Sequence, residues 1–87
     1  MTNDKILEFI ENKNRKNIPV NIHFKERSTI KGLFIMGHDY EEMKSKNFWR
    51  IVNAEKLGEW KRTRDINLSR LFNGISFTRL SDEPNKE

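Results

Sequence analysis

The chain has 87 residues, no cysteine and a net charge of +4, with 34% hydrophobic and 34% charged residues. This length fits one small domain, and the absence of cysteine excludes disulfides and cysteine-ligated zinc. The low apolar content leaves a small core, so we expect self-association to complete burial, while the positive charge permits an anionic partner.

The N-terminal residues predict a short amphipathic helix over residues 3–13. Thr2 or Asn3 can cap its start. The first twenty residues carry acidic side chains and have no apolar run, which argues against a signal peptide or a membrane anchor there. We therefore expect a cytoplasmic protein. The apolar positions recur at helical spacing and form one stripe that should pack on a sheet: Ile6, Leu7, Phe9 and Ile10.

Residues 19–39 predict a long β-hairpin. Apolar and polar side chains alternate over residues 20–24, which is the two-residue period of a half-buried strand. A hydrophilic bend at 25–28 is followed by a second apolar run at 30–36. The hairpin ends in a turn-type cluster that holds an imidazole, a carboxylate and a phenol, namely His38, Asp39 and Tyr40.

Three further strands are predicted. After a charged connection at 41–46, residues 48–52 are rich in aromatic and β-branched side chains and predict a third strand, in which Trp49 is a core residue. Residues 53–57 predict a turn or a continuation of that strand, and Gly58 a bend or bulge. Alternation over 66–72 predicts the fourth strand.

The last predicted reversal is Asn73-Gly74, a dipeptide typical of tight turns, which leads into a fifth strand at 75–80. Residues 81–87 have nothing to bury and are predicted to be a disordered tail, so one domain spans residues 1–80. A flat five-stranded sheet would leave two exposed edges and a bare face. We therefore expect a mainly β fold, an N-terminal helix followed by an antiparallel sheet bent into a small barrel.

This pattern resembles the Sm and Sm-like (LSm) family, whose bacterial branch is the Hfq RNA chaperone. Phe24 and Gly32 have the spacing of the family's first motif, and Asp39 follows seven residues after Gly32, one later than usual. The Met-Asn that commonly follows the Asp in the family's first motif is missing here. In the family's second motif a basic residue precedes a glycine, and Asn73 replaces that basic residue in this chain. The second motif is matched by Phe72, Asn73, Gly74, Phe77 and Leu80.

The resemblance implies a ring and an RNA site. In that family the fourth and fifth strands of neighbouring subunits pair, and single-stranded RNA lies on the loops around the pore. Carried over to this chain, the RNA-binding loops correspond to His38, Asp39 and Tyr40 and to Asn73 and Gly74. No cofactor is implied.

A second candidate surface interleaves an aromatic side chain with cations. Trp60, Lys61, Arg62 and Arg64 have the composition of a nucleic-acid contact, and in an extended chain Trp60, Arg62 and Arg64 would share one face. The alternative interpretation is a solvated basic turn offset by nearby acidic residues.

Catalysis and metal binding have little support, because the chain offers two histidines, no cysteine and no serine-centred elbow. The sequence therefore predicts a homo-oligomeric protein that binds single-stranded RNA and is not an enzyme. The alternative is a protein-interaction or scaffold module built on the same barrel.

Overall fold

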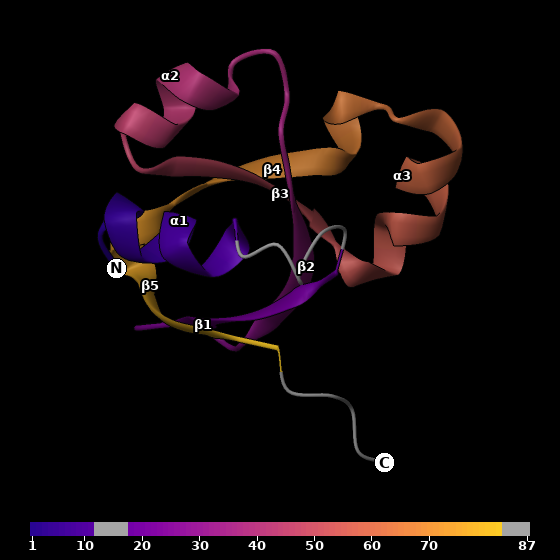
Figure 1. Ribbon diagram of the computed structural model, residues 1–87. Coiled ribbons are helices and arrows are strands. Elements are labelled where there is room, and N and C mark those ends of the chain that lie inside the picture. The colour runs from indigo at the N-terminus through magenta and orange to yellow at the C-terminus, as the bar shows by residue number, and fades with distance from the viewer. Residues whose placement is uncertain (12–17, 83–87) are drawn as a thin grey trace.

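The computed structural model describes residues 1–11 and 18–82 (Figure 1). Short 3₁₀ turns precede α3, β4 and β5, at Ala54–Lys56, Ile66–Leu68 and Gly74–Ser76. The helices and strands in chain order are α1 (Asn3–Ile10), β1 (Val20–Phe24), β2 (Ile30–Ile35), α2 (Tyr40–Ser45), β3 (Phe48–Asn53), α3 (Leu57–Thr63), β4 (Ser69–Asn73) and β5 (Phe77–Ser81).

The five strands form one antiparallel sheet in the order β4-β3-β2-β1-β5. The β1–β2 hairpin sets Val20 opposite Gly32, and on its other side β1 sets Ile22 opposite Leu80 of β5. The predicted helix followed by five antiparallel strands is thus confirmed. The two outer strands of the sheet are β4 and β5.

The sheet is not closed into a barrel. Within the described residues no backbone ladder joins the outer strand β4 to β5 or to β1. Side chains cover part of the opening, because the rings of Phe24 on β1 and Phe72 on β4 lie 5.8 Å apart. The guanidinium of Arg27 lies 5.2 Å from the first ring and 5.9 Å from the second.

Helix α1 lies between the β3–β4 side of the curved sheet and the β1–β5 side (Figure 1). The Thr2 hydroxyl accepts a hydrogen bond from the Lys5 backbone N–H, which fixes the start of the helix. Ile6 is fully buried in the main core, so the predicted packing helix is confirmed. The helix ends at Ile10, three residues before the predicted end, and residues 12 and 13 lie outside the described part.

The main core gathers apolar side chains from α1 and from three strands. Trp49 is 2% exposed, which confirms it as a core residue. A second, smaller core forms where α3 covers β2 and β3, and half-buried Trp60 packs against it. The buried side chains of the main core are Ile6, Val20, Ile22, Trp49, Ile51, Phe77 and Leu80, and those of the second are Leu33, Ile35 and Val52.

Two predicted connections are helices. Residues 41–46 were expected as a charged connection, but most of them belong to α2, whose first turn carries Glu41 and Glu42 at the favourable end of the helix dipole. The turn predicted at 53–57 is a 3₁₀ turn at Ala54–Lys56, but the bend or bulge predicted at Gly58 was wrong, because Gly58 lies within α3. In the described part of the chain, no helix is long and apolar enough to span a membrane.

The last two strands begin later than predicted. Residues 66–68 form a 3₁₀ turn because the Asp65 carboxylate accepts a hydrogen bond from the Asn67 backbone N–H, so β4 starts at Ser69. A second 3₁₀ turn at 74–76 replaces the expected tight reversal and delays β5 to Phe77. The predicted tail starts too early, because Ser81 belongs to β5 and is buried, and residues 83–87 lie outside the described residues.

Candidate functional site

The turn between β2 and α2 holds the first three predicted site residues. The Asp39 carboxylate accepts two hydrogen bonds from the Arg50 guanidinium on β3, at 3.1 Å from Nε and 2.8 Å from an Nη. Those bonds hold the pKa of Asp39 below its usual value. His38 lies beside it and is exposed. Asp39 therefore ties the turn to the sheet, and His38 keeps part of its surface open to solvent.

Tyr40 is held by contacts within the subunit. Its hydroxyl donates a hydrogen bond to the Glu11 carboxylate over 3.2 Å, and its ring lies edge-on to Trp49. The Lys44 ammonium lies 5.0 Å from the ring centroid. Burial, with the nearby Glu11 charge, raises the pKa of Tyr40 well above its usual value. The ring is thus a packing group and offers little free surface for a base.

The Asn73-Gly74 turn is also engaged in the fold. The Asn73 side-chain oxygen accepts a hydrogen bond from the Ile75 backbone N–H, which caps the following 3₁₀ turn. Gly74 donates its N–H to the Asn47 carbonyl at 2.8 Å, and its own carbonyl accepts from the Met1 amino group at 2.9 Å. Both residues stabilise the junction between the N-terminus, the loop before β3 and the start of β5.

Close packing explains why position 74 is a glycine. A Cβ there would clash with the Asn47 side-chain oxygen and would lie 2.6 Å from the Ile6 side chain. Ile6 lies on α1, and Glu11, the partner of Tyr40, follows the C-terminal end of the same helix. The structure therefore connects the two predicted RNA loops through α1, and among the described residues no hydrogen bond joins Tyr40 to Gly74 directly.

The second predicted surface lies on α3 and differs from the expected arrangement. Residues four apart on a helix share a face, whereas residues two apart do not. Trp60 and Arg64 accordingly stack, with the guanidinium 5.6 Å from the ring, while Lys61 and Arg62 are exposed on other sides of the helix. The prediction that Trp60, Arg62 and Arg64 share one face was wrong because this segment is helical.

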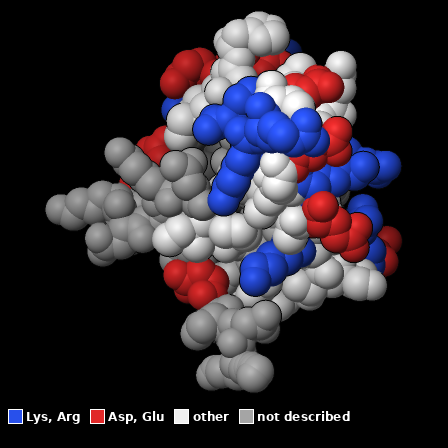
Figure 2. All heavy atoms as spheres, turned by 90° about the vertical axis from the view of Figure 1, so that its right-hand side faces the viewer, with Lys and Arg blue, Asp and Glu red and all other residues white. Residues whose placement is uncertain are grey.

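Helix α3 ends at an unusual backbone position. Arg64 adopts the left-handed conformation (φ 56°, ψ 30°), and its N–H donates to the Trp60 carbonyl at 2.7 Å. This C-cap geometry turns the chain at the end of the helix beside Trp60. Figure 2 shows Lys and Arg side chains gathered on the face that carries α3, with acidic side chains close to them.

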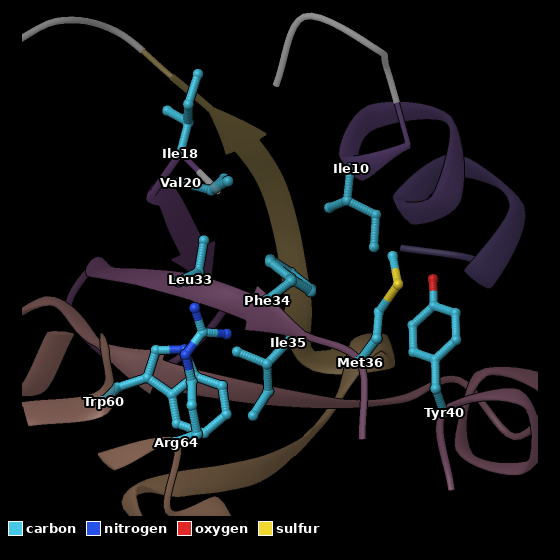
Figure 3. Close-up of a pocket in the computed structure, with 10 residues that line it drawn as sticks. All are labelled: Ile10, Ile18, Val20, Leu33, Phe34, Ile35, Met36, Tyr40, Trp60 and Arg64. Carbon is cyan, nitrogen blue, oxygen red and sulfur yellow. The ribbon is translucent and has the colours of Figure 1, made fainter. Parts of the chain in front are cut away.

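An apolar groove of about 370 Å³ runs beside this surface (Figure 3). Trp60 and Arg64 lie on one side of it, and Tyr40, Met36 and Ile10 lie on the other. The sequence prediction missed the groove. Its available signals were the i, i+4 spacing of Trp60 and Arg64 and the apolar Met36 just beyond a strand, where it is 66% exposed.

Neither a cluster of metal ligands nor a comparison with known proteins assigns the chain to a family. Within residues 1–11 and 18–82, no three His, Asp or Glu side chains gather as metal ligands would. No protein-family model matches the chain, and neither the curated proteins nor the solved structures gave a significant match.

Proposed function

We propose that this protein is a cytoplasmic, Sm-like module that self-associates and binds single-stranded RNA. The observation that carries the proposal is the strand order, which leaves β4 and β5 as the two outer strands of the sheet. These are the strands that neighbouring subunits pair in the family that the sequence resembles. A ring would give each outer strand a partner and complete the open sheet.

The edges have the surface expected of an assembly site. Leu71 on β4 is 44% exposed and Ile75, just before β5, is 61% exposed, although both are large apolar side chains. An unpaired strand edge also presents free backbone donors and acceptors to another chain. Pairing β4 of one subunit with β5 of the next would cover both.

RNA would meet the side chains that the fold leaves available. Lys61 and Arg62 are exposed cations that can contact phosphates, and Trp60 with Arg64 supplies a stacked aromatic and guanidinium pair. His38 adds an exposed imidazole from the β2–α2 turn. In this proposal the two loops are held in place by Asp39, Tyr40, Asn73 and Gly74. Binding requires no cofactor.

Two measurements test the proposal together. Light scattering gives the oligomeric state, and titration of a labelled oligouridine at several salt concentrations gives the affinity and the number of phosphates that the protein neutralises. The proposal requires an oligomer and a salt-dependent affinity. A monomer at high micromolar concentration would remove the ring.

The second candidate function is a protein-interaction or scaffold module on the same sheet. It is favoured by the contacts of Asp39 with Arg50 and of Tyr40 with Glu11, which occupy side chains that RNA would otherwise meet. An oligomer that binds no oligouridine even at low salt would support this function over RNA binding.

A further inference from the structure

The open seam of the sheet, between β1 and β4, carries aromatic rings and a guanidinium at the surface. Phe24 at the end of β1 and Phe72 on β4 lie 5.8 Å apart across the seam, and both rings are half-buried. The Arg27 guanidinium, from the bend between β1 and β2, lies 5.2 Å from the first ring and 5.9 Å from the second. Arg27 is itself exposed. The two rings therefore position a planar cation that is open to solvent.

The surface is hollowed around this cluster. One hollow of about 410 Å³ extends to Lys25, and another of about 170 Å³ extends to Lys56 and Arg70. Both hollows are lined by Arg27 and Phe72, so they meet at the cluster and together form the seam groove. The larger hollow is within the usual size of small-molecule pockets, about 300–1,000 Å³.

Cations outnumber carboxylates in the lining of the seam groove. The cations are Lys25, Arg27, Lys56 and Arg70, and the carboxylates are Glu26 and Glu55, all of them exposed. In the parts of the chain that the structure describes, none of these cations forms an ion pair with a carboxylate. Their charges are therefore free to attract an anion.

Single-stranded RNA fits this groove better than an acidic peptide does. A base can stack on an arginine guanidinium as well as on an aromatic ring, whereas Asp and Glu side chains offer the cluster no aromatic face. Phosphates recur along a nucleic acid strand, and cations line both hollows, with Lys25 in one and Lys56 in the other. Lys56 immediately precedes α3, the helix that carries Lys61 and Arg62. One strand can therefore contact both α3 and the seam.

We propose that the seam groove is a second contact surface for single-stranded RNA, with one base stacked on Arg27 and neighbouring phosphates on Lys25 and Lys56. This inference rests on the proposed RNA binding and deepens it, because it adds a base-stacking position on the β1–β2 bend rather than on α3. Phe72 is a positioning residue here, since it acts on the base through Arg27.

Fluorescence anisotropy of a labelled oligouridine with the full chain tests the guanidinium. Arg27→Lys keeps the charge but removes the plane on which a base stacks, and Arg79→Lys is the same change at an exposed residue outside the groove. Arg27→Lys should weaken binding about fivefold or more with an unchanged salt slope, because stacking releases no counterions. Arg79→Lys should change the affinity less than about twofold, because the charge is kept and no stacking position is lost.

A second measurement locates the strand on the protein. In an NMR titration of the Lys61→Gln/Arg62→Gln variant at low salt, oligouridine should still shift the backbone amide signals of Lys25, Arg27 and Phe72 saturably. An abasic oligonucleotide of the same length keeps the phosphates and lacks the bases. It should bind wild type at least about fivefold more weakly than oligouridine does, because it cannot stack on Arg27.

Failure of the seam site can be told apart from failure of RNA binding. Wild type that binds no oligouridine at low salt would remove RNA binding itself, and the seam site with it. If wild type binds oligouridine but Arg27→Lys and Arg79→Lys have equal affinities, or if the amide signals of the seam stay in place, only the seam site is wrong.

Two further results would change the occupant and overturn the proposal. An abasic oligonucleotide that binds as tightly as oligouridine would mean that the groove attracts phosphates without stacking a base. An oligoglutamate peptide that shifts the same amide signals at the same concentration as oligouridine would make the groove a site for an acidic peptide.

Discussion

Arg50 on β3 donates hydrogen bonds to both carboxylate oxygens of Asp39, and this pair connects the turn before α2 to the sheet. Because the pKa of Asp39 is lowered in the fold, its ionised form stabilises the native state. That stabilisation is complete above the ordinary carboxyl pKa of about 4 and disappears as the pH falls through the lowered value.

Asp39→Asn should therefore lower the free energy of unfolding at neutral pH, and the difference from wild type should shrink in acid. Urea unfolding at several pH values measures it. Glu42→Gln is the control, because the Glu42–Lys46 pair is 3.4 Å apart and largely exposed, and such pairs contribute little. If the difference in unfolding free energy between Asp39→Asn and wild type does not change with pH, the role assigned to the carboxylate is contradicted.

Gly74 and Gly58 should respond oppositely to the same substitution. Gly74→Ala forces a methyl group into the Ile6 and Asn47 side chains and should destabilise the protein by about 1–3 kcal/mol. Gly58→Ala on α3 meets nothing within 4 Å and should stabilise it by about 0.5–1 kcal/mol. Equal effects in thermal or urea unfolding would show that position 74 is not tightly packed.

Helix α1 should be essential to the core. Ile6 is fully buried, so Ile6→Ala should cost about 2–5 kcal/mol in urea unfolding. Ile18→Ala, the same change at a residue that is 43% exposed, should cost well under half as much. A decrease below about 1 kcal/mol for Ile6→Ala would mean that the helix is peripheral and that its apolar face serves a partner.

The regular part of the fold could be predicted because it follows from local patterns. Val20, Ile22 and Phe24 alternate with polar residues, so the period of β1 is visible in the sequence, and Trp49 lies in a run that suits a buried strand. The connections were harder to predict. Gly58 and the neighbouring acidic and basic residues suggest a bend, but Trp60 packing on the second core stabilises a helix there.

The site was harder to predict than the strands because its contacts join distant residues. Asp39 meets Arg50 only after β2 and β3 have paired in register, and Gly74 meets Asn47 from a distant part of the chain. Neither contact can be read from a local sequence pattern. The sequence therefore predicted where the two loops lie but could not show that most of their polar side chains already have partners within the subunit.

Self-association through the sheet edges should be sensitive to one side chain. Wild type should scatter light as an oligomer, whereas Leu71→Asp on β4 should be monomeric, because it places a charge on an exposed apolar edge. Met36→Asp, an equivalent change at an exposed residue away from both edges, should remain oligomeric. If Leu71→Asp and Met36→Asp keep the same mass as wild type, the edges do not mediate assembly.

The most direct test of the proposed function is the salt dependence of oligouridine affinity, measured by fluorescence anisotropy for wild type and for the double variant Lys61→Gln/Arg62→Gln. Wild type should bind at low salt. The double variant should flatten the slope of log affinity against log salt by about 0.7 for each phosphate that it no longer neutralises. Wild type that binds no oligouridine at low salt, or a double variant with an unchanged slope, would contradict RNA binding through α3.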